Sequence, residues 1–369
     1  ISAFGFRLPT AMPSAPLSPG TTPAGEFSVA FVHTDGITHY RSVSGAVTIA
    51  RKGRKAAGTV IVENPKVRHI YNKAQLDAWG EGMADNEQYF TVYLDADINY
   101  GSGTWSHSNT RFNGNFIGQK HKIYNIIVES STKTGFIYEL WGQFKDVVFG
   151  SLDGSSWDGV SRITHKGTAG DVEYVGLIST LQANASLMEG VTSYAPVSVP
   201  GGYNTRAFLG GLAGYIASGM TVTMTDCKNY GSVSNSSSWT GSETRMGGIV
   251  GQCGGALSAT GLENHGALTV NNAKTTFVGG LCGDLGAGST VTGSSNHGSI
   301  SFADSGTTKT YLGGCFGSVR GSILSSCHNY AALTASRNAE QWFGGIAGYM
   351  EAGETSLTDC VNHSGADME

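Results

Sequence analysis

An internal repeat of about 33 residues constrains the fold of this chain more than any other feature. Five copies of a glycine-pair motif read FLGGLAGY, RMGGIVGQ, FVGGLCGD, YLGGCFGS and WFGGIAGY, and the first glycines of the pairs are Gly210, Gly247, Gly279, Gly313 and Gly344. One asparagine trails each copy at a similar distance: Asn229, Asn264, Asn296, Asn329 and Asn362. Because two separate markers share one spacing, each copy is best treated as one structural unit.

Each unit consists of short strands rather than helices. Residues 311–336 contain three short runs, YLGGCFGSV, SILSSCHNY and AALTAS, and none has the 3.6-residue period of a helix. The sequence therefore predicts an all-β fold, a right-handed parallel β-helix (β-solenoid) with three strands in each coil of about 33 residues. Degenerate copies at 134–140 (TGFIYEL) and 174–180 (YVGLIST) bring the expected total to about seven or eight coils.

Both markers have structural explanations in a stack of coils. An asparagine at one turn of every coil can donate its side-chain amide to the asparagine of the next coil, which gives a ladder. The following position holds rings that suit stacking: Tyr230, His265, His297, Tyr330 and His363. Apolar residues flank each glycine pair, so we expect a bulge or sharp corner there, where glycines avoid a Cβ clash. The glycine-rich patterns of phosphate-binding loops are absent from the sequence, which argues against a nucleotide site.

The chain ahead of the repeats divides into three parts. Five of the eight prolines fall within the first 23 residues, so residues 1–25 are expected to form a Pro-rich extended linker. Residues 26–66 alternate in polarity and predict a small β-rich segment, in which RKGRK (51–55) forms a solvated hairpin tip or a polyanion-binding patch. The β-helix is expected to occupy residues 67–369.

NKAQLDAWGEGMA (72–84) is the best helix candidate, and it is expected to cover the open end of the solenoid. Asn72 and Gln75 suggest a capping box, and Leu76, Trp79 and Met83 share one face. The last repeat lies close to the C-terminus without an evident cap, so its exposed strand edge is expected either to meet a partner or to mark a truncated chain.

Two further segments carry a resemblance to a known family. YFTVYLDADINY (89–100) and FNGNFIGQKHKIYNIIV (112–128), followed by the GG[LI][AVC]G copies, resemble bacterial surface β-helix proteins with GLUG-type repeats, which are common in anaerobic gut bacteria. The resemblance covers residues 68–369. It implies an exported cell-adhesion protein at the cell surface or outer membrane, with membrane contact only through a lipid anchor on a precursor lipoprotein.

The charged residues give little support to catalysis. The net charge of -5 argues against a nucleic-acid partner. Parallel β-helices also include polysaccharide lyases and hydrolases, which need carboxylates grouped on one face. The acidic residues of the repeats occupy different coil positions: Glu189, Asp226, Glu243, Glu263, Asp284 and Asp304. Asp95, Asp97 and Asn99 only mimic the start of a calcium loop, because Gly101 comes one residue late and no Glu follows at the twelfth position, so Asp95 and Asp97 are expected on one face of a strand.

The remaining candidates are weak. Asp153 and Asp158 suit turn chemistry. His265 and His297 could supply two metal ligands, which is too few for a site. The six cysteines are expected to be buried free thiols, and a disulfide between Cys327 and Cys360 is the alternative.

We nominate no catalytic, metal-binding or cofactor-binding residue, and we expect no cofactor. Trp157 and Trp239 lie in polar loops and are candidate contacts to a glycan or protein ligand. The sequence thus favours a non-catalytic surface protein that binds a glycan or protein through a rigid face. A β-helix polysaccharide lyase or glycoside hydrolase is the alternative, and a purely structural stalk is the third class.

Overall fold

A computed structural model gives the fold. It describes residues 28–32, 38–42, 67–84, 87–107, 111–131, 133–167, 172–184, 186–200, 206–236, 241–271, 275–303, 309–335, 340–351 and 354–364. The chain divides into two compact units, Ile1–Pro65 and Lys66–Glu369. In the first unit, β1 (Ser28–Val32) pairs with β2 (Thr38–Ser42) in an antiparallel hairpin. The expected linker 1–25 and the RKGRK stretch lie outside the described residues.

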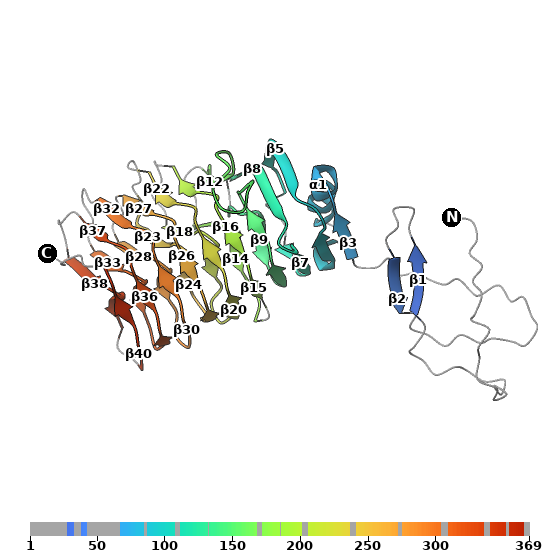
Figure 1. Cartoon of the computed structure of the whole chain (residues 1–369). Coiled ribbons are helices and arrows are strands. Elements are labelled where there is room, and N and C mark those ends of the chain that lie inside the picture. The colour runs from blue at the N-terminus through green and yellow to red at the C-terminus, as the bar shows by residue number, and fades with distance from the viewer. Residues whose placement is uncertain are drawn as a thin grey trace, which may run out of the picture. The chain divides into compact units, whose positions relative to one another are not determined.

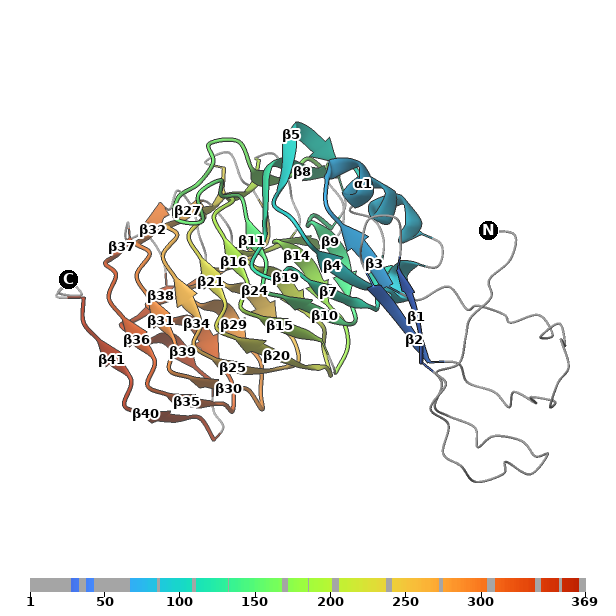
Figure 2. The ribbon, with the colours of Figure 1, turned by 45° about the vertical axis from the view of Figure 1, so that its right-hand side comes forward.

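The second unit is a parallel β-solenoid, which is shown from two sides in Figures 1 and 2. Its four sheets run along the stack, and neighbouring strands within each sheet come from successive coils. The ten-stranded sheet contains β3 (Val67–Ile70), β4 (Thr91–Leu94), β7 (Asn115–Ile117), β10 (Gln143–Lys145), β15 (Leu187–Glu189), β20 (Thr221–Thr225), β25 (Ala256–Thr260), β30 (Thr290–Thr292), β35 (Ile323–Ser325) and β40 (Ser356–Thr358).

Two sheets meet at the glycine pairs. The six-stranded sheet contains β13 (Glu173–Val175), β18 (Arg206–Gly210), β23 (Glu243–Gly247), β28 (Thr275–Gly279), β33 (Lys309–Gly313) and β38 (Glu340–Gly344). The eight-stranded sheet contains β6 (Arg111–Phe112), β9 (Ile137–Leu140), β14 (Ile178–Leu181), β19 (Ala213–Ile216), β24 (Val250–Cys253), β29 (Cys282–Leu285), β34 (Phe316–Val319) and β39 (Ala347–Met350).

The fifteen-stranded sheet has two arms that join at the long strand β8 (Lys122–Ser130), which also pairs with β5 (Ile98–Trp105). One arm contains β12 (Arg162–His165), β17 (Val197–Val199), β22 (Val233–Asn235), β27 (Leu268–Asn271), β32 (Ile300–Ala303) and β37 (Leu333–Ala335). The other contains β11 (Val148–Phe149), β16 (Thr192–Ser193), β21 (Lys228–Asn229), β26 (Glu263–Asn264), β31 (Ser295–Asn296), β36 (His328–Asn329) and β41 (Val361–Asn362).

Each repeat therefore supplies five short strand segments, as in β23 to β27, where three were expected. The six-stranded sheet marks about six full coils of about 33 residues, fewer than the seven or eight expected. The copy at 174–180 supplies both β13 and β14. The copy at 134–140 supplies β9 but adds only an isolated bridge, Thr134 to Val175, beside the six-stranded sheet. The earlier turns are thus incomplete coils.

Inward-facing apolar side chains fill the solenoid. Leu209, Met246, Val278 and Leu312, for example, form one fully buried column on the six-stranded sheet. All six cysteines are free, and only Cys360 is not fully buried, so the expected thiols are present and Cys327 is not joined to Cys360. Burial raises the pKa of Cys227 to about 12, which leaves this thiol uncharged and unreactive.

The helix α1 (Lys73–Gly82) lies where the stack begins, and the short 3₁₀ helix η1 (Glu87–Tyr89) follows it (Figure 1). Asn72 Oδ1 accepts a hydrogen bond from the Gln75 backbone N–H at 3.1 Å, as expected for the N-cap. Gln75 Oε1 accepts a hydrogen bond from the backbone N–H of Tyr71. In a capping box it would accept from the N–H of the N-cap residue, Asn72. Leu76, Trp79 and Met83 are fully buried, so the predicted apolar face of the helix is correct.

The helix packs on the first coils through aromatic contacts. The ring of Trp79 lies 5.3 Å from the ring of Phe112 and 5.0 Å from that of Phe116, measured between centroids. Within the described part of the chain, no helix has the length and apolar character needed to cross a membrane.

Candidate functional site

The glycine pair forms the corner between the six-stranded and eight-stranded sheets. A Cβ on Gly279 would lie 2.2 Å from the carbonyl oxygen of Cys282, and a Cβ on Gly280 would lie 2.1 Å from Cγ of Asn296. Neither glycine has a positive φ, so the requirement is for close approach rather than for a left-handed backbone. The second glycine of each pair thus makes room for the asparagine of its own repeat, and the two sequence markers are in contact.

The asparagines form the expected ladder. Their Nδ2 atoms donate to the next Oδ1 at 3.0, 2.9, 2.9 and 2.8 Å along Asn229, Asn264, Asn296, Asn329 and Asn362. In addition, Asn296 Nδ2 donates to Gly298 O, and its Oδ1 accepts from the Gly298 N–H. All but Asn362 are buried. Since these amides are fully used inside the fold, the ladder is structural and offers nothing to a ligand.

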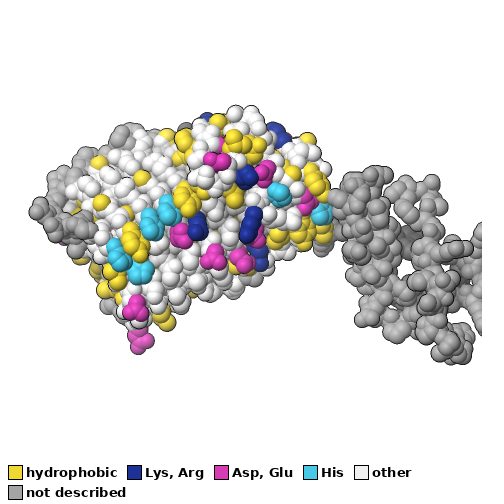
Figure 3. Space-filling view, viewed as in Figure 1, with side chains coloured by type: hydrophobic (Ala, Val, Ile, Leu, Met, Phe, Trp, Pro, Cys, Tyr) yellow, Lys and Arg dark blue, Asp and Glu magenta, His cyan; other side chains and the backbone are white. Residues whose placement is uncertain are grey.

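The ring ladder lies beside the asparagines and is one ring longer than expected. It consists of Tyr194, Tyr230, His265, His297, Tyr330 and His363, with successive centroids 4.4–4.7 Å apart and planes within 9° of parallel. Figure 3 shows histidine and hydrophobic side chains in a row on this face, with charged side chains toward the N-terminal coils. Each ring covers the face of its neighbour, so along most of the ladder only ring edges meet the solvent.

Parallel stacking also argues against a metal between His265 and His297. The two imidazole planes differ by only 5°, so their nitrogen lone pairs run side by side instead of converging on one point. Their Nε2 atoms contact Glu263 Oε2 at 3.1 Å and Ser295 Oγ at 3.0 Å, respectively. Among the described residues, no group of three or more His, Cys, Asp or Glu side chains could hold a metal ion.

A second outward column runs along the corner, and we call it the corner stripe. On the six-stranded sheet it contains the first residue of each motif copy: Tyr174, Phe208, Arg245, Phe277, Tyr311 and Trp342. On the eight-stranded sheet it contains the last: Tyr215, Gln252, Asp284, Ser318 and Tyr349. The two columns touch, with ring centroids 4.7 Å apart for Tyr174 and Tyr215 and 5.2 Å apart for Tyr311 and Tyr349.

Arg245 lies at the centre of the corner stripe. Its guanidinium group lies 5.2 Å from the Phe208 ring and 4.9 Å from the Phe277 ring, a cation–π arrangement on both sides. The same group donates to Glu243 and to Asp284. Arg245 therefore continues the aromatic column by stacking while bringing a charge into it.

Asp284 connects this arginine to two further charges. Arg320 Nη2 lies 3.0 Å from Asp284 Oδ2, and Arg320 Nε lies 3.9 Å from Glu351 Oε2. The Asp284 side chain is 3% exposed. Burial raises the pKa of Asp284, although Arg245 and Arg320 both act to lower it. We call Glu243, Arg245, Asp284, Arg320 and Glu351 the charged centre.

The charged centre corrects one expectation. Glu243 and Asp284 occupy different coil positions in the sequence, yet Arg245 joins them, because the six-stranded and eight-stranded sheets meet at the corner. One signal was visible in the sequence: the other four glycine-pair copies begin with an aromatic residue, whereas this copy begins with Arg245.

The carboxylates nearer the N-terminus are paired. Asp95 and Asp97 lie in the turn between β4 and β5, not within a strand as expected. Asp95 Oδ2 lies 2.6 Å from His69 Nδ1, and Asp97 Oδ2 lies 2.6 Å from Lys122 Nζ. Burial acts to raise the pKa of Asp97, but hydrogen bonds from Lys122 and His121 outweigh it and lower the pKa. These groups hold neighbouring coils together.

Asp153 and Asp158 shape one surface loop. Asp153 accepts from the N–H groups of Ser155 and Ser156, which lower its pKa. Asp158 accepts from the N–H groups of Asn125 and Val160, both at 2.8 Å. Both carboxylates thus satisfy backbone donors, as turn chemistry predicts.

Trp157 lies in the same loop, and its side chain is 49% exposed while Nε1 donates to Ser161 O at 2.7 Å. The loop meets the ring ladder where the Tyr194 hydroxyl donates to Gly154 O at 2.7 Å. Trp239 lies outside the described residues.

Comparison with known proteins supports the fold. No protein-family model matches the chain, and no curated protein matches it in sequence. Among solved structures, it is similar to a crystal structure named "a putative immunoglobulin A1 protease from Bacteroides ovatus", with a TM-score of 0.52 and 16% sequence identity. The match covers 79% of this chain and 83% of that chain. At this identity the similarity shows a shared fold alone.

Proposed function

We propose that this chain is a non-catalytic, exported surface protein that binds a glycan or protein ligand through the corner stripe. The observation that carries the proposal is the register of the stripe. Aromatic side chains and one arginine occupy the same position in six successive coils, and all of them except the buried Phe208 are partly exposed. Aromatic residues and arginine are the residue types enriched where proteins bind partners.

The stripe is also rigid. Stacked rings hold one another, as Phe277, Tyr311 and Trp342 do at centroid distances of 4.6 and 4.7 Å. A surface that is already ordered loses little side-chain entropy when it binds. Tyr349 is 37% exposed, so its ring is the most accessible one in the column on the eight-stranded sheet. These properties suit a ligand that lies along the solenoid axis.

A matched pair of tyrosines tests the proposal. After a screen against immobilised glycans and proteins identifies a ligand, Tyr349→Ala should weaken binding by at least about tenfold, the scale of a hot-spot residue. Tyr230→Ala removes a tyrosine of similar exposure, 38%, from the ring ladder and should leave binding unchanged. Equal effects of the two substitutions, or no ligand in either screen, would count against the corner stripe.

A β-helix polysaccharide lyase or hydrolase is the second candidate. The specific observation in its favour is the buried Asp284 carboxyl beside Glu243 and two arginines, because perturbed carboxyl groups next to charged partners are frequent at catalytic sites. The test is incubation with acidic and neutral polysaccharides, and with immunoglobulin A1 in view of the name of the Bacteroides ovatus structure. Turnover that Asp284→Asn abolishes would establish an enzyme in place of a binding protein.

Export to the cell surface is the part of the proposal that rests on the resemblance of residues 68–369 to surface β-helix proteins. Labelling of intact producing cells with a reagent that does not cross membranes tests it. The protein should be labelled without cell lysis, and labelling only after lysis would refute surface exposure.

A further inference from the structure

The outward face of the ten-stranded sheet carries two regular columns of side chains, all of which bear a hydroxyl group except Ile323. One column contains Thr223, Ser258, Thr290, Ile323 and Ser356, and the other contains Thr225, Thr260, Thr292, Ser325 and Thr358. Successive strands of a sheet lie about 4.8 Å apart, so hydroxyl groups repeat at this interval along the solenoid. We call these ten positions the threonine face. It is separate from the corner stripe, which lies on the other two sheets.

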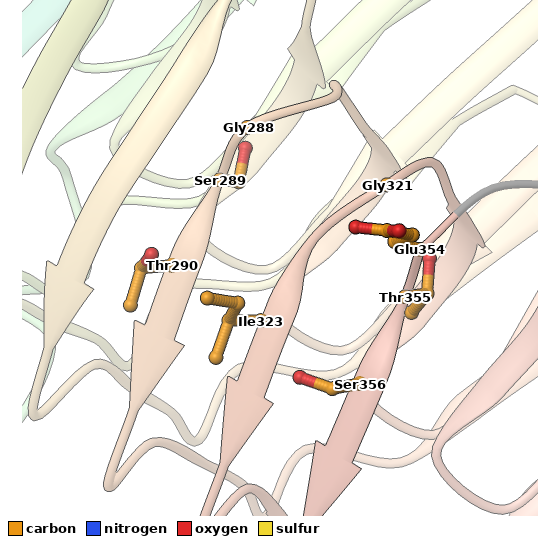
Figure 4. A pocket seen from close by; sticks show the side chains of 8 residues that line it. All are labelled: Gly288, Ser289, Thr290, Gly321, Ile323, Glu354, Thr355 and Ser356. Carbon is orange, nitrogen blue, oxygen red and sulfur yellow. The ribbon is translucent and has the colours of Figure 1, made fainter.

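A hollow of about 480 Å³ opens beside this face in the C-terminal coils, as Figure 4 shows. Its depth comes from Gly288 and Gly321, which precede β30 and β35. A Cβ on either glycine would have no neighbour closer than 3.8 Å, so the space above both is open. Volumes of about 300–1,000 Å³ are typical of small-ligand sites. The hollow is therefore large enough for one or two sugar rings.

The lining suits a ligand rich in hydroxyl groups. Thr290 and Ser356 supply hydroxyls that can both donate and accept, and they lie two strands, or about 9.6 Å, apart. Ile323 lies between them and is 54% exposed, which provides an apolar contact for the C–H face of a ring. The exposed carboxylate of Glu354 lies at the edge of the hollow beside Gly321 and can accept from two neighbouring hydroxyls (Figure 4).

The charge of the lining selects among ligands. Among the described residues that line the hollow, Glu354 is the one ionisable group. With a negative charge and no cation there, an acidic sugar would be repelled. We propose that the hollow is a binding subsite for one or two sugar residues of a neutral polysaccharide, whose chain continues along the threonine face. The subsite is on a different face from the corner stripe, so it stands or fails separately from the proposed function.

Affinity electrophoresis of the whole chain tests the subsite with named probes: a neutral β-glucan, a mannan and a galactan, together with acidic polygalacturonate and cationic chitosan. At least one neutral polysaccharide should retard the protein. Ile323→Arg fills the hollow from an exposed position, and Glu354→Ala removes the acceptor. Each should raise the dissociation constant for that polysaccharide at least tenfold while the thermal midpoint stays within a few degrees of the parent.

Ser301→Arg is the matched control, because it places the same side chain at an exposed position of the fifteen-stranded sheet, outside both the hollow and the threonine face. It should change the dissociation constant less than twofold. The subsite is refuted if no neutral polysaccharide binds, if Ile323→Arg has no effect, or if Ser301→Arg weakens binding equally. Binding of chitosan alone, lost in Glu354→Ala, would reassign the hollow to cationic ligands. Loss of binding in Tyr349→Ala but not in Ile323→Arg would support the corner stripe and reject the hollow.

Discussion

At the scale of single residues, the asparagine ladder and the glycine pair depend on each other. The second glycine leaves the space that the asparagine fills, and the asparagine amide bonds the backbone C=O and N–H two residues further on, at Gly298 in the case of Asn296. A side chain on the glycine would displace the amide, and a shorter residue at the asparagine would leave its hydrogen bonds unmade. This contact explains why both markers recur together in every repeat.

Substitutions in the interior of the asparagine ladder should destabilise the protein more than a substitution at its exposed end. Asn296→Ala removes an acceptor for Asn264 and a donor for Asn329 in a buried setting, so we expect a loss of about 2–3 kcal/mol in the free energy of unfolding. Asn362→Ala at the exposed end should cost less than about 1 kcal/mol, since water can replace the amide there. Urea unfolding of both variants measures the difference. Equal losses would show that ladder hydrogen bonds are not what stabilises the corner.

The ring ladder should make the protein sensitive to acid. Burial and the neighbouring His265 lower the pKa of His297, so the folded state binds fewer protons at this site than the unfolded chain does. This group's contribution to stability is therefore complete at neutral pH and is lost as the pH falls through its unfolded value of about 6.5. Glu263, which faces His265, opposes the shift only in part.

His297→Tyr provides the test, because tyrosine occupies the same column in three other coils. The urea midpoint should fall less between pH 7.5 and pH 5.5 in this variant than in the parent. Tyr330→Phe keeps the ring and every histidine, and its pH dependence should match that of the parent. An unchanged pH dependence in His297→Tyr would show that this imidazole has the same pKa in the folded and the unfolded state.

The sequence was informative at this scale wherever one residue type fills a column. The asparagines and the stacked rings could be predicted from spacing alone, because in-register coils bring like residues together. Tyr194 was missed since its repeat lacks the trailing asparagine. Asp284 and Arg320 were missed because their partners lie on a different sheet or coil, and sequence spacing does not show how sharply two sheets meet.

At the scale of elements, α1 and the first coils form an aromatic cluster that differs from the rest of the core. Trp79 contacts Trp105, Phe112, Phe116 and Phe136, whereas the later coils are filled mainly by aliphatic side chains. The helix itself could be predicted from its cap and its apolar face. The division of each coil into five strand segments could not be predicted from the sequence, because the interruptions between segments depend on the path of the backbone around the core.

Trp79→Ala should destabilise the solenoid by about 3–5 kcal/mol, the usual cost of removing a fully buried aromatic side chain. Chemical unfolding monitored by circular dichroism measures it. Lys73→Ala on the exposed side of the same helix should change stability by less than about 0.5 kcal/mol, although it breaks the ion pair with Asp77. A small effect of Trp79→Ala would mean that the helix does not hold the first coils together.

At the scale of the whole solenoid, each coil contacts only its neighbours, so stability is close to a sum over coils and their interfaces. The side chains of β38 to β41 are half-buried or exposed, whereas those of β23 to β27 alternate between buried and outward positions. Local opening is easiest where few apolar contacts are lost. Protection from hydrogen exchange should therefore fall toward β41.

Native-state hydrogen exchange followed by mass spectrometry can measure this gradient. Amides of β38 to β41 should exchange at least about tenfold faster than those of β23 to β27. Trp79→Ala should speed exchange in β3 and β5, which the helix contacts, and leave the rates of β38 to β41 unchanged, because the coils between them carry the coupling one interface at a time. Uniform protection from β3 to β41 would show instead that the solenoid opens as one cooperative unit, and the ligand-binding faces would then be equally rigid along their whole length.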